Sequence, residues 1–222
     1  MKPPLYYVAL GDSLTEGYGV GEEDSFVAVY SRLMESALGR RVIYLNAGVT
    51  GETTTDILDR MSKDADLQEA IRQADLISLT AGGNDLLGAA REFLLHRDPQ
   101  VLKAALRLFT INIRRIIEAI KHIRAAPGQD RAKRLVMRIL NLYNPFPIIE
   151  ETDYWIERFN RQWQAYETPY IRIVDLYEAF QYRTDDLIGE DMVHPNVLGY
   201  RTMAEAAHAL GYAGLDEDDN VT

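Results

Sequence analysis

The chain has 222 residues, 47% of them hydrophobic, with a formal net charge of -10 and no cysteine. This length suits one large α/β domain, and the hydrophobic share excludes a chain that is disordered throughout. The lack of cysteine excludes disulfides, thiolate nucleophiles and cysteine-ligated metal sites. The acidic balance and the absence of a rich basic stripe argue against nucleic-acid binding and against adsorption to anionic membranes.

No segment approaches the ~18 apolar residues that a membrane-spanning helix needs, so we expect no stable membrane insertion. Residues 1–4 contain no signal-like apolar run. We therefore expect a cytoplasmic protein, and secretion stays open if an export signal has been removed. Residues 1–215 are predicted to form one domain and residues 216–222 an acidic, solvated tail. Nothing in the sequence indicates an oligomeric state.

Apolar periodicity predicts strands and helices that alternate along the chain. In chain order they are a strand at 6–10, a helix at 26–38, a strand at 42–45, a helix in two pieces at 54–74, a strand at 76–80, a helical region at 86–126 broken near 98–99, a strand at 134–142, a helix at 154–166, a strand at 171–175 and a helix from about 195 to 210. Five strands separated by helices predict a three-layer α/β/α fold with a doubly wound parallel sheet.

Three segments allow alternative interpretations. Residues 17–21 have a G-x-G spacing, but the third glycine of a dinucleotide site is misplaced and no ribose-binding acid is evident. Within 86–126, four cations lie off the apolar stripe, as either a solvated face or a basic partner-binding face: Lys103, Arg107, Arg114 and Lys121. The region 86–126 as a whole fits either a lid or a plain helix pair.

A hydroxyl and an imidazole are expected at one edge of the sheet. Ser13 follows the first strand directly, and open parallel sheets bind ligands outside the carboxyl ends of their strands. Asp191 and His194 are three residues apart beside the start of the last helix, so the carboxylate can hold the imidazole in one tautomer. A serine needs such a base to act as a nucleophile. The alternatives are a helix cap at Ser13 and a capping Asp191 beside a surface histidine.

Gly48 and Asn84 are candidate donors to a developing oxyanion. Each follows a predicted strand, and a backbone amide at a glycine turn with a carboxamide can stabilise such a charge. Taken singly, Gly48 is better explained as a turn glycine, and Asn84 as an Asx turn or helix cap.

Four blocks of the sequence resemble those of the SGNH (GDSL) hydrolase family, in the family's order: GDSLTEG at 11–17, NAGVTGETT at 46–54, GGND at 82–85 and DMVHPN at 191–196. The resemblance implies a flavodoxin-like five-stranded sheet of order 2-1-3-4-5 and a serine esterase or lipase that forms an acyl-enzyme. It implies Ser13 as nucleophile, His194 as base and Asp191 as its partner. The implied oxyanion hole comprises the Ser13 amide, the Gly48 amide and the Asn84 side chain. One departure is Met192, where a glycine often precedes the hydrophobic residue.

The expected partner is a small ester, and no metal or organic cofactor is required. The four histidines show no paired spacing of metal ligands. Loop residues predicted to border the site and contact substrate are Tyr18, Leu86, Tyr143, Phe146 and Val193. Such an apolar collar suits short to medium acyl chains, although loop hydrophobics that pack under their own segments are equally compatible. Open alternatives are a carbohydrate O-acetylesterase, a thioesterase or lysophospholipase, and a non-catalytic binding module on the same fold.

Overall fold

The computed structural model describes residues 2–125 and 135–215. The turn predicted at 126–130, the first residue of the strand predicted at 134–142, and the acidic segment 216–222 lie outside these ranges.

The predicted sheet is confirmed in strand number, direction and order. It consists of β1 (Leu5–Gly11), β2 (Val42–Gly48), β3 (Leu76–Thr80), β4 (Val136–Leu140) and β5 (Ile171–Val174). All neighbouring pairs are parallel and the order is β2-β1-β3-β4-β5. All five carboxyl ends therefore lie along one edge, where Gly11 of β1 pairs with Gly48 of β2.

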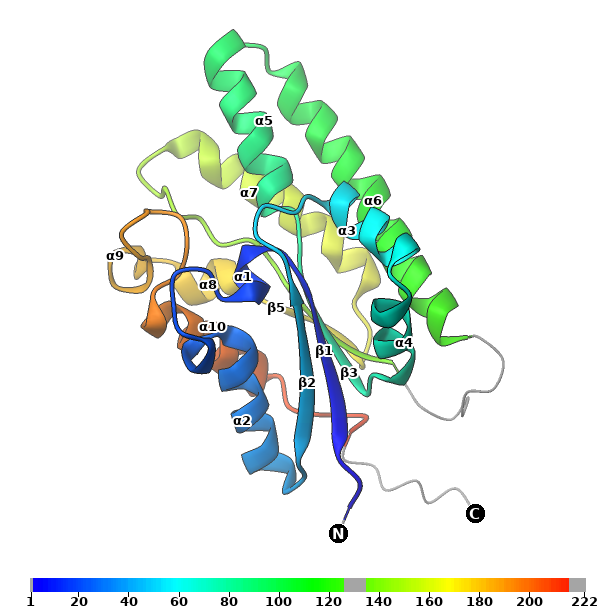
Figure 1. Cartoon of the computed structure of the whole chain (residues 1–222). Coiled ribbons are helices and arrows are strands. Elements are labelled where there is room, and N and C mark those ends of the chain that lie inside the picture. Colours follow the sequence, from blue (N-terminus) through cyan, green and yellow to red (C-terminus); the bar gives the residue numbers. More distant parts are fainter. Residues whose placement is uncertain (1, 126–134, 216–222) are drawn as a thin grey trace.

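Helices cover both faces of the sheet (Figure 1). One face packs on α2 (Phe26–Leu38) and α10 (Val197–Ala209). The other packs on α3 (Thr54–Lys63), α4 (Ala65–Gln73), α6 (Gln100–Arg124) and α7 (Glu150–Trp163). The helix α5 (Gly83–His96) packs chiefly on α6, and the joined ends of these two helices extend beyond the carboxyl edge of the strands (Figure 1).

The inward face of α6 follows the predicted apolar stripe. Its residues Leu102, Phe109, Ile113, Ile116, Ile117 and Ile120 are buried, and Ala105 is partly buried against the same cluster. Asn112 is also buried there and donates to the hydroxyls of Thr54 and Thr55 at 3.0 Å each, which joins α6 to the start of α3. Packing on the sheet therefore fixes α6, because a stripe of this length buries well only in one orientation.

Short helices occupy loops near the carboxyl edge, namely α1 (Ser13–Glu16), η1 (Glu22–Asp24), α8 (Leu176–Phe180) and α9 (Thr184–Leu187). Another, η2 (Gln164–Tyr166), follows α7 and precedes the start of β5. The helices α8 and α9 lie between the strand predicted at 171–175 and the helix predicted from about 195, where the sequence predicted no helix. There, Asn141 at the end of β4 accepts hydrogen bonds from the amides of Leu176 and Tyr177, which starts α8.

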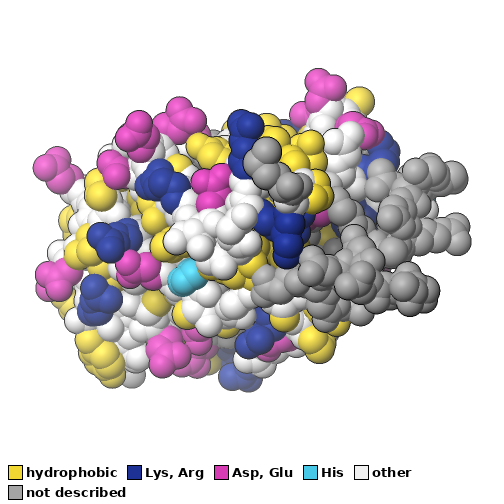
Figure 2. Space-filling model, turned by 90° about the horizontal axis from the view of Figure 1, so that it is seen from below, with side chains coloured by type: hydrophobic (Ala, Val, Ile, Leu, Met, Phe, Trp, Pro, Cys, Tyr) yellow, Lys and Arg dark blue, Asp and Glu magenta, His cyan; other side chains and the backbone are white. Residues whose placement is uncertain are grey.

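The face at the amino ends of the strands carries acidic and basic side chains interspersed with scattered apolar ones (Figure 2). Across the described ranges, none of the helices combines the length and apolar character that a bilayer crossing requires.

Candidate active site

Ser13 lies where β1 turns out of the sheet. The turn depends on Gly11, which has φ +153, because a side chain there would meet Thr80 Oγ1 at 2.2 Å. Ser13 is the first residue of α1, and the helix cap is the preceding Asp12, whose Oδ1 accepts the Leu14 amide at 3.1 Å. The Ser13 hydroxyl is therefore not used as a cap and is available for other contacts.

The structure brings Ser13 together with His194, which lies 181 positions further along the chain. Ser13 Oγ lies 2.8 Å from His194 Nε2, and His194 Nδ1 lies 2.5 Å from Asp191 Oδ2. The second oxygen of Asp191 accepts the backbone amides of Val193 and His194 at 3.0 and 2.9 Å. The carboxylate thus fixes both the ring and the turn that carries it, which leaves Nε2 directed at the hydroxyl.

The Asp191 carboxyl is ionised over the whole range of ordinary pH. Its partial burial acts to raise its pKa, but hydrogen bonds from the His194 ring and from two backbone amides outweigh this and lower the pKa to about 2. A charged partner of this kind holds the imidazole in the tautomer with a proton on Nδ1 and stabilises the imidazolium that forms when Nε2 takes a proton.

A second carboxyl, that of Asp12, lies buried beside the serine. Burial raises its pKa, partly offset by hydrogen bonds from the Thr80 hydroxyl at 2.8 Å and the Leu14 amide. The Thr80 hydroxyl also lies 2.8 Å from that of Thr15 in α1. These contacts join the ends of β1 and β3 beneath Ser13 and hold its backbone in place.

Tyr143 lies beneath the histidine loop, not at the rim where the sequence placed it. Its side chain is buried, its ring is stacked on Phe180 at 4.4 Å, and its hydroxyl donates to the Val193 carbonyl at 2.7 Å. Tyr143 therefore supports the peptide before His194 and does not form a wall of the opening.

Gly48 also differs from its predicted role. Its amide donates to Asn46 Oδ1 at 3.0 Å, so it is not free to face a substrate. A side chain at Gly48 would come within 2.1 Å of the Glu16 backbone nitrogen, so this glycine is needed for the close contact between β2 and α1. Three residues on, the Gly51 amide donates to no residue that the structure describes, and Gly51 has φ +86.

Asn84 is held against the same turn. As the second residue of α5, it donates from Nδ2 to the Glu52 carbonyl at 2.8 Å, and that amide nitrogen carries a second proton. The Glu52 carboxylate in turn forms a two-pronged ion pair with Arg60, at 2.8 and 2.7 Å. Arg60 also donates to the Ala47 carbonyl at 2.9 Å, so α3 braces both ends of the turn. The sequence alone does not reveal this pair, because charged residues eight apart carry no catalytic signature.

Of the other residues predicted to contact substrate, Val193 belongs to the loop that carries His194 and Leu86 to the first turn of α5. Tyr18 is 47% exposed, and its ring centroid is 4.5 Å from that of His194. Phe146 and Val193 are half-buried, and Leu86 packs into the core cluster beside α6. Three further apolar side chains on loops are strongly exposed: Met192 at 64%, Ile148 at 98% and Ile149 at 50%.

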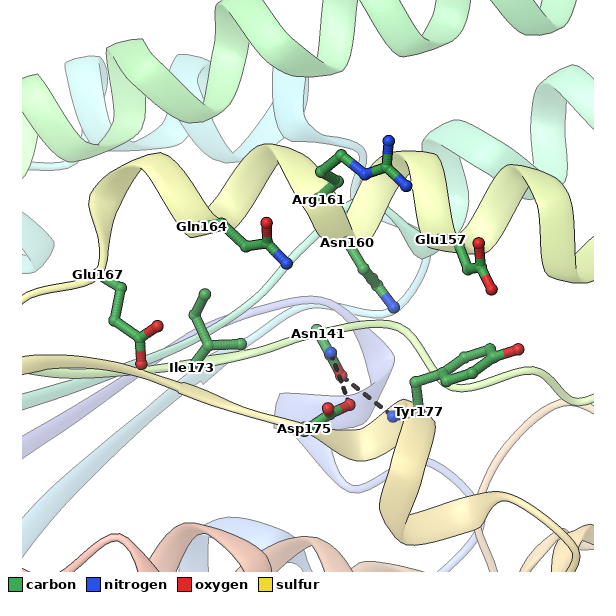
Figure 3. A pocket seen from close by; sticks show the side chains of 9 residues that line it. All are labelled: Asn141, Glu157, Asn160, Arg161, Gln164, Glu167, Ile173, Asp175 and Tyr177. Carbon is green, nitrogen blue, oxygen red and sulfur yellow. Dashed lines mark hydrogen bonds between the residues drawn. The ribbon is translucent and has the colours of Figure 1, made fainter.

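A polar cavity of about 450 Å³ lies elsewhere, between α7 and β5 (Figure 3). It is lined by Asn141, Glu157, Asn160, Arg161, Gln164, Glu167, Ile173, Asp175 and Tyr177, and none of these contacts Ser13 or His194 in the hydrogen bonds described above. Within the described residues, no three acidic or histidine side chains lie close enough to ligate a metal ion. That the reaction needs no metal stays a prediction.

Comparison with known proteins shows the family of the chain. Residues 9–202 match the model of the GDSL-like Lipase/Acylhydrolase family. The chain is 37% identical over 214 residues to the spore germination lipase LipC of Bacillus licheniformis, covering 96% of this chain and 99% of that protein.

Solved structures give the same result. The lipase Lip_vut3 from a goat rumen metagenome superposes with a TM-score of 0.86 at 37% identity, covering 94% of this chain and 98% of the other. A member of the lipolytic G-D-S-L family from Veillonella parvula is 21% identical with a TM-score of 0.62, covering 91% and 96%, and establishes the fold alone. The chain belongs to the GDSL-like lipase/acylhydrolase family and is a carboxylic ester hydrolase of the lipase/esterase type.

Proposed function

We propose that the chain hydrolyses esters of short to medium acyl chains through an acyl-enzyme on Ser13. The observation that carries this proposal is the continuous path from Ser13 Oγ to His194 Nε2 at 2.8 Å and from His194 Nδ1 to Asp191 at 2.5 Å. A hydroxyl, an imidazole and an ionised carboxylate in this order can generate a nucleophile at neutral pH.

In the proposed mechanism, Nε2 of His194 accepts the hydroxyl proton as Ser13 Oγ bonds to the ester carbonyl carbon. The tetrahedral intermediate then collapses as His194 returns that proton to the departing alcohol oxygen. A water molecule, deprotonated by the same imidazole, attacks the acyl-enzyme, and the carboxylic acid leaves as the proton passes back to Ser13.

The developing oxyanion needs donors that are already in place. We assign this role to the Ser13 amide, the second Nδ2 proton of Asn84 and the Gly51 amide. Gly51 replaces Gly48 because the Gly48 amide is bonded to Asn46, whereas Gly51 adjoins the Glu52 carbonyl that Asn84 contacts.

An acyl substrate is supported by the exposed Tyr18 ring beside His194, by the exposed Met192 in the loop that carries His194, and by the two relatives that are lipases at 37% identity. The family's sugar O-acetylesterase and thioesterase alternatives have no such support in this chain. A series of p-nitrophenyl esters from acetyl to palmitoyl, run beside acetylated sugars and acyl thioesters, measures the preference directly. We expect the highest kcat/KM for esters of intermediate chain length, and a preference for acetylated sugars would overturn the assignment.

Labelling with a fluorophosphonate tests the nucleophile. We expect one modified residue, Ser13, by peptide mapping, and no labelling of Ser13→Ala. The matched control is Ser62→Ala on α3, which should label like the wild type. Ser13→Ala should lower kcat by roughly 10³- to 10⁶-fold while the protein stays folded. Labelling at another serine, or retained turnover in Ser13→Ala, contradicts the proposal.

A further inference from the structure

The charge of the chain is unevenly distributed. Between Gly83 and Arg124, which spans α5 and α6, eight lysines and arginines stand against four aspartates and glutamates, a net charge of +4 in a chain that totals -10. The remainder therefore carries -14. The expectation that the chain avoids anionic surfaces was drawn from the total, and it does not apply to this pair of helices.

The free end of the pair, residues 91–108, combines cations with exposed leucines. Leu94 and Leu95 are 61% and 65% exposed, and Leu108 is 48% exposed. The exposed cations around them are Arg91, Arg97, Lys103 and Arg107, against the acids Glu92 and Asp98. This end projects beyond the carboxyl edge of the sheet (Figure 1), so a flat surface can reach it without meeting the acidic body first.

The exposed side of α5 is continuous with the site. Asn84, Leu87, Arg91 and Leu94 recur at spacings of three and four, which places them on one side of a helix. None of the α5 residues is buried, and Leu87 is 40% exposed. An apolar and cationic strip thus runs from the proposed oxyanion donor Asn84 to the free end of the hairpin.

We propose that the free end of the α5–α6 hairpin, residues 91–108, docks the enzyme on an anionic lipid surface, with Leu94 and Leu95 entering the acyl region. This inference rests on the proposed hydrolysis of acyl esters. Interspersed leucines and cations favour such a surface over neutral lipid, because apolar burial and attraction to anionic headgroups act together. The strip beside Asn84 then guides a lipid molecule from the surface to Ser13.

Vesicle sedimentation tests the docking. The binding assay uses the full chain with Ser13→Ala, so that lipid is not consumed, and vesicles of phosphatidylglycerol or of phosphatidylcholine. We expect at least tenfold stronger binding to phosphatidylglycerol at 0.1 M salt, weakening as salt is raised. Leu94→Ser with Leu95→Ser, and separately Lys103→Gln with Arg107→Gln, should each lower binding by about tenfold or more.

Matched controls remove the same chemistry elsewhere. Ile43→Ser removes an exposed apolar side chain from β2, and Lys63→Gln with Arg201→Gln removes two exposed charges from α3 and α10. These variants should bind vesicles like the parent. For the activity assay, the hairpin substitutions are made in the protein with its native Ser13. All of these variants should hydrolyse soluble p-nitrophenyl butyrate at the wild-type rate.

The outcomes separate the two proposals. Absent or headgroup-independent vesicle binding, or unchanged binding by both hairpin variants, overturns the docking even if soluble esters are hydrolysed. Self-association in sedimentation velocity that disappears in the leucine variant assigns the hairpin end to a second copy of the chain instead. Failure to hydrolyse any soluble ester counts against the proposed function and leaves the vesicle result to be judged alone.

Discussion

Among the described residues, the Asn84 side chain forms one hydrogen bond, and that bond also orients it. Its Nδ2 donates to the Glu52 carbonyl, which leaves one proton for a substrate oxyanion. Asn84→Ala should therefore lower kcat by about 10²- to 10³-fold with a small change in KM, because the oxyanion forms only in the transition state. Its stability cost should be about 1 kcal/mol, the net value of one hydrogen bond. Steady-state kinetics and thermal melts measure both, and an unchanged kcat removes Asn84 from the oxyanion hole.

Substitution of Asp191 tests the proposed triad, because its two oxygens have different hydrogen-bond partners. In Asp191→Asn the remaining oxygen can still accept the amides of Val193 and His194, so the loop should keep its shape. The amide nitrogen cannot accept the proton on Nδ1, and kcat should fall by roughly 10⁴-fold. Across the ordinary pH range the activity of the wild type should show no step from Asp191, because hydrogen bonds lower the pKa of its carboxyl to about 2.

The Asp191 carboxylate also makes the free energy of unfolding depend on pH in the acid range. Its folded pKa lies below its ordinary value, so its contribution is present above about pH 4 and is lost as pH falls toward about 2. In Asp191→Asn the free energy of unfolding should therefore decline less between pH 4 and 2 than in the wild type. Urea unfolding at several pH values measures this, and parallel curves for the two proteins would remove Asp191 as the cause.

At the residue scale, the sequence predicted that Ser13, His194 and Asp191 share one site, because their order and spacing carry chemical meaning, and the structure brings them within hydrogen-bonding distance. The sequence could not separate Gly48 from Gly51, the donor that we propose in its place. Which amide is free depends on the Asn46 side chain, and no pattern reports that contact. Tyr143 was misplaced because its burial depends on Phe180, which is far away in sequence and stacks on it only after folding.

At the element scale, the contact between β2 and α1 allows no side chain. A methyl group at Gly48 would lie 2.1 Å from the Glu16 nitrogen and 2.6 Å from the Thr15 carbonyl carbon. Gly48→Ala should cost about 1–3 kcal/mol and lower kcat, because α1 must shift and carry Ser13 with it. The control is Gly21→Ala, where a side chain meets nothing within 4 Å and neither quantity should change. Chemical denaturation and ester kinetics on both variants decide the matter.

The loop that carries His194 contains a strained residue. Met192 has φ +61, a conformation that glycine adopts without cost, and its side chain is 64% exposed. Met192→Gly should raise the free energy of unfolding by up to about 1 kcal/mol, whereas Met192→Ala, which keeps the Cβ atom, should not. Both should keep the wild-type kcat for a soluble ester. Equal stability of the two variants would show that the backbone here is not strained.

Long periodic elements were predicted well, and short ones were not. The stripe of α6 and all five strands follow from apolar spacing alone. In contrast, α8 and α9 have five and four residues, too few to show a helical period, and α8 starts through contacts with Asn141 on another strand. The start of α7 lies at Glu150, four residues before the predicted start, because no side-chain cap marks it.

At the scale of the whole molecule, two cores on opposite faces of the sheet differ in their relation to the site. The cluster with α2 and α10 lies beneath Ser13 and His194. The cluster with α6 and α7 lies beneath Gly82, which precedes α5 and therefore Asn84. Loss of packing in either core should lower the free energy of unfolding. Its effect on kcat should depend on which site residues are supported by that core.

Phe109 connects the second core to the start of α5, which carries the proposed oxyanion donor Asn84. Its ring packs against Phe159 at 4.6 Å and Trp163 at 5.6 Å, and it lies so close to Gly82 that a side chain there would meet it at 2.5 Å. Phe109→Ala should cost about 3–5 kcal/mol and also lower kcat, because Gly82 and the first turn of α5 lose their support. Met34→Ala, in the other core on α2, should cost about 2–5 kcal/mol with kcat unchanged. Both variants are assayed below their melting temperatures. If Phe109→Ala and Met34→Ala lower kcat equally, reduced stability, and not the position of Asn84, explains the loss of activity.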